Sequence, residues 1–126
     1  VYYSIWNAGA DAELTINGGN YTTTNNVALR DTWAYTVTCR DGAKMTINGG
    51  SFNGNHGVIS AIGGAEVVIN GGTFYTTAAY TGGTSSWVFY AEGGTIRYDE
   101  DNCVVNSDCV GGPVYGPHIG TSVTTF

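Results

Sequence analysis

Apolar and polar residues alternate in three short segments of the chain, and each segment runs directly into the tripeptide Asn-Gly-Gly. The apolar positions of the three segments are Ala12, Leu14 and Ile16, then Ala43, Met45 and Ile47, then Ala65, Val67 and Ile69. Alternation with a period of two is typical of a β-strand with one buried face. The pattern therefore predicts three equivalent strands, each with a defined inner side.

Each of these strands belongs to a longer phrase, in which a strand, a glycine turn and an aromatic residue follow in the same order. The copies span residues 15–21, 46–52 and 68–74, and a weaker fourth copy is Glu92-Gly93-Gly94-Thr95-Ile96. Gly50, Gly72 and Gly94 are spaced by 22 residues, whereas Gly19 and Gly50 are 31 apart. Self-similarity at a fixed period is typical of solenoid proteins. We expect insertions into this period near residues 24–31 and 78–85.

An Asn-Gly pair alone would favour a two-residue hairpin, but a fixed repeat favours parallel stacking of the copies. Stacking would place Tyr21, Phe52 and Phe74 in one inner column. Outside, Glu13, Lys44 and Glu66 would alternate in charge along neighbouring strands, which makes them a structural ladder. We expect structural turns, with an amide ladder through their asparagines, at Asn17, Gly18, Gly19, Asn48, Gly49, Gly50, Asn70, Gly71 and Gly72.

A second kind of strand and turn precedes each copy. Val37-Thr38-Cys39 comes before Arg40-Asp41-Gly42, Ser60-Ala61 before Ile62-Gly63-Gly64, and Phe89-Tyr90-Ala91 before Glu92-Gly93-Gly94. The last turn can be aligned with either kind of turn, and the sequence leaves both alignments open. About three short strands separated by glycine turns are therefore expected in each coil.

Over residues 4–98 the Ile-Asn-Gly-Gly-x-aromatic copies resemble the pectate-lyase-like right-handed parallel β-helix family. The resemblance implies an all-β fold, a short right-handed parallel β-helix (β-solenoid) of about five coils. Residues 1–98 are expected to form the β-helix coils, whereas residues 99–126 depart from the repeat and are expected to form a C-terminal loop and terminal strand of the same domain. The family includes polysaccharide lyases and hydrolases, phage tailspikes, adhesins and surface fibres, so the resemblance predicts an architecture and leaves the activity open.

Composition narrows the class of partner. The chain has 126 residues, 42% of them hydrophobic and 13% aromatic, which is too apolar for a disordered polar tract. Its net charge of −6 opposes contact with a phosphate backbone, so nucleic acid is not expected as a partner. No run of 18 apolar residues occurs, and no membrane span is predicted.

The cysteines indicate a compartment. Cys103 and Cys109 enclose five residues, a spacing that suits a small disulfide loop in the C-terminal region. Such a bond favours an extracellular, cell-surface or virion-surface location, although free thiols in a reducing compartment remain the alternative. Cys39 stands apart, either as a buried strand residue or as a bridge between subunits. The spacings of zinc sites are missing.

Candidate catalytic and metal-binding groups are few. Asp99, Glu100 and Asp101, with Asp108 nearby, are a calcium candidate, for which a solvated acidic loop is the alternative. Asp41 lies in a turn, where Asp is common. His56 and His118 lack a nucleophile with an orienting acid. The acid clusters of the family's enzymes match no positions here, so we expect no enzyme activity and no cofactor.

Two surface motifs complete the set of candidate sites. Asn20-Tyr21-Thr22 is an acceptor tripeptide for N-glycosylation at Asn20, directly after a turn. An ice-binding solenoid would need a sustained threonine ladder, but the matching outer positions are Thr15, Thr46 and Val68. Ice binding is therefore not favoured.

Both ends of the chain are strand-like and neither carries an amphipathic capping helix, although isolated solenoids need polar caps. We hypothesise a non-enzymatic subunit of an extracellular filament or surface fibre that assembles head to tail with copies of itself, with assembly candidates Tyr3, Ile5, Trp6, Val123 and Phe126. One alternative is a carbohydrate-binding or carbohydrate-active module that presents exposed rings of Trp33, Tyr35, Trp87 and Tyr90 to glycans. A phage or virion fibre segment is the other.

Overall fold

The computed structural model describes residues 4–23, 35–54, 57–76, 87–107, 114–115 and 123–126. Fourteen β-strands and no helix occur in these ranges, which confirms the all-β prediction. Both predicted insertions, 24–31 and 78–85, lie outside the described residues.

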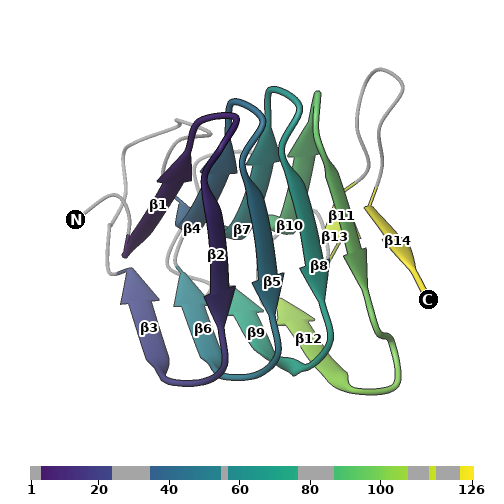
Figure 1. Ribbon diagram of the computed structural model, residues 1–126. Coiled ribbons are helices and arrows are strands. Elements are labelled where there is room, and N and C mark those ends of the chain that lie inside the picture. Colours follow the sequence, from purple (N-terminus) through teal and green to yellow (C-terminus); the bar gives the residue numbers. More distant parts are fainter. Residues whose placement is uncertain (1–3, 24–34, 55–56, 77–86, 108–113, 116–122) are drawn as a thin grey trace, which may run out of the picture.

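The strands form three parallel sheets (Figure 1). Sheet A contains β1 (Ile5–Ala8), β4 (Tyr35–Arg40), β7 (Gly57–Ile62), β10 (Trp87–Glu92) and β13 (Val114–Tyr115). Sheet B contains β2 (Glu13–Ile16), β5 (Lys44–Ile47), β8 (Glu66–Ile69), β11 (Thr95–Tyr98) and β14 (Val123–Thr125). Sheet C contains β3 (Asn20–Thr23), β6 (Ser51–Gly54), β9 (Gly72–Thr76) and β12 (Cys103–Ser107). The chain passes through A, B and C in turn and then repeats one strand further along, as in a solenoid.

Sheet B has the register that the alternating pattern predicts. Lys44 pairs with Glu13 on one side and with Glu66 on the other, so the charges alternate across three strands. The Lys44 Nζ and Glu66 Oε2 atoms are 3.9 Å apart, and both side chains are largely exposed. An exposed pair of this kind contributes about 0–1 kcal/mol. The ladder therefore helps to fix the register more than it stabilises the fold.

The Asn-Gly-Gly corner between sheets B and C carries the predicted amide ladder. Asn70 Nδ2 donates to Asn48 Oδ1 at 2.8 Å, and Asn48 Nδ2 donates to Asn17 Oδ1 at 2.9 Å. The second glycine of each corner has a positive φ, 117° at Gly50 and 131° at Gly72. Residues with a Cβ rarely adopt this conformation, which explains why the corner requires glycine.

The predicted aromatic column is also present inside the stack. The ring of Phe52 lies between those of Tyr21 and Phe74, with centroid separations of 4.9 and 5.0 Å. Phe52 and Phe74 are buried, and Phe89 from sheet A packs edge-on against Phe74. Rings stacked along neighbouring strands thus link sheets C and A through the core.

The predicted fourth copy of the repeat, Glu92-Gly93-Gly94, lies at a different corner of the coil from the one that its spacing predicts. Glu92 pairs with Ile62, and Gly64 donates its backbone N–H to Gly93, so this turn matches Ile62-Gly63-Gly64 at the corner between sheets A and B. The residue that pairs with Gly72 is Cys103. The spacing of 22 residues between Gly72 and Gly94 is therefore a coincidence, and the fourth-copy assignment is corrected.

The sheets continue beyond residue 98, into the segment expected to be mainly loop. β12, β13 and β14 add one strand to sheets C, A and B, respectively. Asp99 takes the corner position of Asn70, because Asp99 N donates to Ile69 O just as Asn70 N donates to Ile47 O. The repeat thus persists in the backbone after its motif has disappeared from the sequence.

Asp41 offers a test of the corner between sheets A and B. Its φ of 58° matches the 62° of Gly63 and the 70° of Gly93 in the equivalent turns. We expect Asp41→Ala to unfold with a free energy about 1 kcal/mol lower than that of Asp41→Gly, because both variants lose the carboxylate but only alanine retains a Cβ in the left-handed region. Urea denaturation of the two variants measures the difference, and equal stabilities would contradict the strained turn.

Candidate functional site at the two ends of the stack

The stack has two ends, each formed by the outermost strand of every sheet. β1, β2 and β3 form one end, drawn in purple in Figure 1, and β12, β13 and β14 form the opposite end, in green and yellow. Among the described residues, each of these strands pairs with a neighbour on one side only. An unpaired edge presents backbone N–H and C=O groups to which another strand can add. We refer to the two surfaces as the N-terminal end and the C-terminal end.

At the N-terminal end, the inner side chains are covered from one side only. Leu14 is half-buried, whereas Met45, the next residue of its column, is 2% exposed. Four partly buried apolar residues pack against the core at this end, namely Ile5, Ala12, Leu14 and Tyr21. The core of the protein therefore reaches the surface here.

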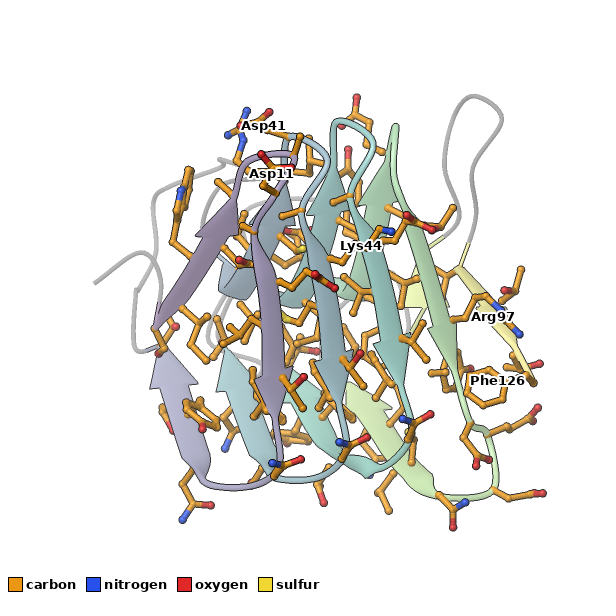
Figure 2. The ribbon with its side chains drawn as sticks, in the orientation of Figure 1. Asp11, Asp41, Lys44, Arg97 and Phe126 are labelled. Atoms are coloured by element: carbon orange, nitrogen blue, oxygen red, sulfur yellow. The ribbon has the colours of Figure 1, made fainter. Side chains whose placement is uncertain are left out.

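The C-terminal end has the same character. The partly buried residues of its strands that pack against the core are Cys103, Val105 and Val123. Val104 and Phe126 are about half exposed, at 53% and 49%. Figure 2 shows Arg97 and Phe126 together at this end, and the guanidinium carbon lies 5.0 Å from the centre of the ring. A cation–π contact at an exposed site contributes about 0.5–1 kcal/mol.

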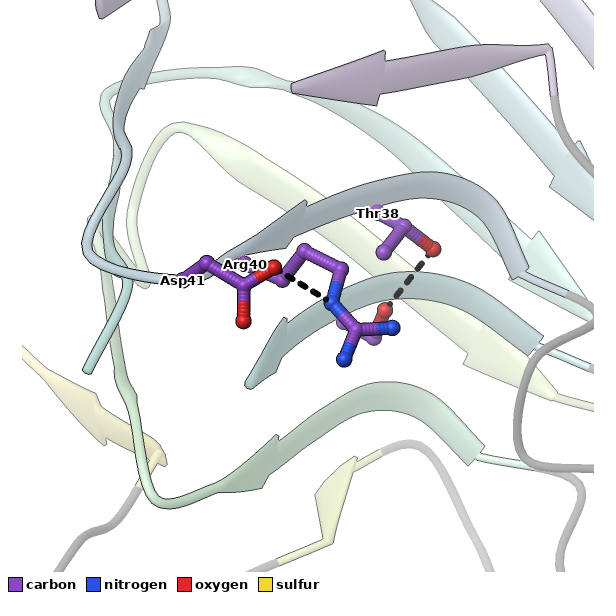
Figure 3. A network of polar contacts seen from close by, with 4 residues as sticks. Thr38, Arg40 and Asp41 are labelled. Carbon is purple, nitrogen blue, oxygen red and sulfur yellow. Dashed lines mark hydrogen bonds and ion pairs between the residues drawn. The ribbon is translucent and has the colours of Figure 1, made fainter. Parts of the chain in front are cut away.

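A similar contact occurs at the N-terminal end. The Arg40 guanidinium carbon is 5.4 Å from the centre of the Trp6 ring, which is 49% exposed. Arg40 Nε also donates to Asp41 Oδ2 at 3.1 Å (Figure 3). Nearby, the Ser60 hydroxyl of β7 forms a buried hydrogen bond with the Thr38 hydroxyl. The predicted assembly residues Ile5 and Trp6 thus lie at one end, and Val123 and Phe126 at the other. Tyr3 lies outside the described residues.

The C-terminal end is stepped. Sheets A and B each have five strands, but sheet C has four in the described part of the chain. In chain order a strand of sheet C follows each strand of sheet B except β14, the last strand that the structure describes. β13 and β14 therefore extend one strand beyond β12.

The aromatic residues predicted to face glycans are not an exposed set. Tyr35 and Tyr90 are 0% and 5% exposed, and their rings stack 5.7 Å apart. The Tyr35 ring lies over Gly57, where an added Cβ would come within 2.1 Å of it, and Tyr90 donates its hydroxyl hydrogen to Glu92. Burial of these rings corrects the expectation of an exposed platform. Trp33 and the side chain of Trp87 lie outside the described residues.

The acidic segment predicted as a calcium candidate forms the corner between β11 and β12. Asp99 Oδ1 accepts from the Asp101 backbone at 3.1 Å, and Asp99 Oδ2 accepts from Asn102 Nδ2 at 2.6 Å. Both oxygens of this carboxylate thus hold the turn. No group of three His, Cys, Asp or Glu side chains that could hold a metal ion occurs in the ranges that the structure covers. Asp108, His56 and His118 lie outside those ranges.

The cysteines differ in their surroundings. Cys39 is buried in the core, where Asn7 Nδ2 donates to its Sγ at 3.6 Å, and burial raises the pKa of its thiol to about 11. Cys103 is a half-buried free thiol at the C-terminal end. Burial and then the negative charge of Asp99 raise its pKa to about 11. Cys109 lies outside the described residues, so the disulfide between Cys103 and Cys109 stays a prediction.

Thiol chemistry provides a test of these pKa values. We expect alkylation of Cys103 by iodoacetamide to be slow at pH 7 and to accelerate about tenfold for each pH unit up to about pH 11, because only the thiolate reacts. Cys39 is expected to react only after unfolding, since its side chain is inaccessible. Mass spectrometry of the labelled protein distinguishes the two. Rapid labelling of Cys103 at pH 7 would contradict the raised pKa, and a Cys103–Cys109 disulfide would appear as labelling of both cysteines only after reduction.

The remaining surface motifs lie where the sequence suggests. Asn20 is the exposed first residue of β3, and its glycosylation stays a prediction. Thr15 pairs with Thr46 and Thr46 with Val68, which confirms that the threonine column is interrupted.

Comparison with known proteins found no matching family model, no similar curated protein and no similar solved structure. Nor does the described part of the chain contain a helix long and apolar enough to cross a membrane.

Proposed function

We propose that this chain is a non-enzymatic structural subunit of an extracellular filament or surface fibre, built as a right-handed parallel β-helix of about five coils. In this proposal the subunit stacks head to tail with copies of itself. The observation that supports it most is the pair of ends, where unpaired strand edges surround half-buried apolar side chains. No cofactor is required for such a role.

Association would bury what the ends leave exposed. Ile5 and Leu14 at one end and Val123 at the other are each partly buried now. Full burial of a side chain of this size is worth about 1.5–3 kcal/mol, so a half-buried one gains about half of that. Added backbone hydrogen bonds along the sheet edges contribute further, against the entropic cost of association.

The geometry favours an open chain of subunits over a closed ring. All three sheets are parallel, so the strand edges exposed at one end are not the same as the strand edges exposed at the other. A contact between two different surfaces of the same protein is heterologous, and it continues indefinitely unless a rotation closes it. Stacking along the sheet-pairing direction gives an elongated assembly.

Four chemically notable side chains of the described residues have a structural explanation, which supports a role without catalysis. Asp99 caps a turn, Asp41 occupies a turn and pairs with Arg40, and Cys39 is part of the core. Lys44 belongs to the charge ladder. The predicted disulfide between Cys103 and Cys109 would suit an extracellular setting.

Electron microscopy and light scattering test the proposal. We expect elongated particles whose mean length increases with protein concentration, and more of them at about 150 mM salt than at 10 mM, because the net charge of −6 opposes association at low ionic strength. A monomer at all concentrations and salt conditions would contradict the proposal. A glycan array in parallel would detect the carbohydrate-binding alternative.

A pair of variants separates the ends from the sides of the stack. Leu14→Glu places a charge on the inner column of the N-terminal end, and we expect it to abolish elongation. Val68→Glu adds the same charge to the outer face of sheet B in the middle of the stack, where it should leave elongation unchanged. Equal assembly of both variants would contradict an interface at the ends.

A further inference from the structure

We infer that Asn17 is a site of spontaneous modification, at which the side-chain amide becomes a carboxylate in the folded protein while the other asparagines that precede a glycine keep their amides. Four such pairs occur in the sequence, namely Asn17-Gly18, Asn48-Gly49, Asn53-Gly54 and Asn70-Gly71. The modification concerns the single subunit and does not depend on the proposed assembly. Its site is set by the direction of the amide ladder and by the surroundings of each glycine.

The reaction requires an asparagine and the backbone nitrogen of the residue that follows it. That nitrogen loses its proton and forms a bond to the side-chain carbonyl carbon, and the bond from this carbon to Nδ2 breaks. The leaving amide takes up a proton and departs as ammonia. Water then opens the cyclic imide at one of its two carbonyls, which leaves aspartate or isoaspartate. Glycine favours the attack because it has no Cβ to obstruct it, and asparagine is among the thermolabile residues.

The direction of the amide ladder distinguishes Asn17 from the other two members. Asn70 Nδ2 donates to Asn48 Oδ1 at 2.8 Å, and Asn48 Nδ2 donates to Asn17 Oδ1 at 2.9 Å. Loss of ammonia from Asn70 or Asn48 would break one of these hydrogen bonds, whereas loss from Asn17 breaks neither. The bond that Asn17 Oδ1 accepts also stabilises the negative charge that develops on this oxygen during attack.

The backbone of the three corners favours the same site. Gly18 is exposed, and no atom lies within 4 Å of a Cβ added there. A Cβ added at Gly49 would lie 3.2 Å from Asn17 O, and one added at Gly71 would lie 3.1 Å from Asn48 O. A carbonyl of the neighbouring corner thus stands against Gly49 and against Gly71. Rotation of either peptide toward the preceding side chain is therefore obstructed, while Gly18 meets no such obstacle among the described residues.

The fourth pair, Asn53-Gly54, is obstructed more strongly. Gly54 is buried, and a Cβ added there would collide with the Gly57 carbonyl oxygen. The backbone oxygen of Asn53 accepts from Thr36 Oγ1 at 2.7 Å, which fixes the peptide that would have to rotate. This pair therefore serves as an internal reference for an unreactive Asn-Gly sequence in the folded protein.

The product also fits the ladder best at Asn17. A carboxylate accepts hydrogen bonds but cannot donate them. In place of Asn17 it would still accept from Asn48 Nδ2, and its charge would strengthen that bond. In place of Asn48 or Asn70 it would set two acceptor oxygens against each other. Asp99 takes the corner position next to Asn70, and its carboxylate forms hydrogen bonds within its own turn instead of extending the ladder.

Tandem mass spectrometry of the full chain tests the modification. The protein is incubated in mildly alkaline buffer, which favours proton loss from the peptide nitrogen, at a dilution at which light scattering detects single subunits. We expect Asn17 to be converted at least about tenfold faster than Asn48 and Asn70, since one ladder hydrogen bond corresponds to about that factor. Asn53 should remain unconverted. In concentrated urea all four should react at similar rates, because unfolding removes the ladder and the obstruction.

Gly18→Ala is the matched control for the reaction. Its Cβ contacts nothing in the fold but obstructs the attack on the Asn17 side chain, so we expect less than a tenth of the product at unchanged stability. A second pair of variants tests the ladder without any reaction. Asn17→Asp should keep the midpoint of urea denaturation, whereas Asn70→Asp should lower it, because only the latter loses a donor.

The outcomes are decided independently of filament formation. Equal conversion of Asn17 and Asn48 in the folded protein would overturn the inferred site, as would an unconverted Asn17 under conditions in which the unfolded chain reacts. A lower urea midpoint for Asn17→Asp than for Asn70→Asp would overturn the direction of the ladder. None of these results changes with the presence or absence of elongated particles at higher concentration, so the proposed function stands or falls separately.

Discussion

Replacing Phe52 by alanine is expected to lower the free energy of unfolding by about 3–5 kcal/mol. The Phe52 side chain is 1% exposed and stacks between the rings of Tyr21 and Phe74, so truncation would leave a cavity bounded on both sides by rings. These rings belong to different strands of a parallel sheet, whose backbone pairing holds them at a fixed spacing and limits collapse of the cavity. Urea or guanidinium denaturation measures the loss.

Tyr21→Ala is the matched control at the end of the same column. Tyr21 is only partly buried, and its hydroxyl donates to Gly18 O at the surface. We expect this variant to lose less than half as much stability as Phe52→Ala in the dispersed protein. Similar losses of unfolding free energy for the two variants would contradict a continuous inner column in which Phe52 is buried between two rings.

Sheet B and the corner that follows it could be predicted from the sequence because local and tertiary constraints coincide there. Each strand has one face toward the core, so the alternation of apolar and polar residues reveals its inner side. The positive φ of Gly50 requires a glycine, and this glycine is part of the repeated motif. Asn48 bonds to both neighbouring asparagines, so identical residues recur at identical positions. Repetition of the side chain then indicates the register of the backbone.

The later strands were harder to predict because backbone pairing does not require the motif. At the corner after β11, the Asp99 carboxylate replaces the amide ladder by accepting hydrogen bonds from Asp101 and Asn102. The corner is also two residues longer than its counterpart at Asn70, since Cys103 pairs with Gly72. Different side chains thus support a similar backbone path at the two corners, so the repeat is lost from the sequence although it persists in the structure.

The candidate site was predictable in part for the same reason. Strand-like termini without capping helices point to the ends, where Ile5, Trp6, Val123 and Phe126 are found. The step at the C-terminal end was not predictable, because it depends on the pairing of β12, β13 and β14. Nor was the burial of Tyr35 and Tyr90, because it depends on the stacking of two rings from strands far apart in the sequence.

Replacing Gly94 by alanine is expected to cost about 3 kcal/mol, at the upper end of the range for overpacking. Gly94 is buried, and an added Cβ would lie 2.8 Å from the Ala61 carbonyl carbon and oxygen and from the Ala65 oxygen. These are backbone atoms of the neighbouring turn, so relief requires that β10 and β11 move away from the strands to which they pair. The variant should unfold at lower urea concentration.

Gly18→Ala is the control for this effect. No atom lies within 4 Å of a Cβ added at Gly18, and the backbone there does not have the left-handed conformation that disfavours alanine. We expect its free energy of unfolding to be unchanged or to rise by less than about 1 kcal/mol, because alanine restricts the unfolded chain. A larger loss at Gly18 than at Gly94 would contradict the close backbone packing around Gly94.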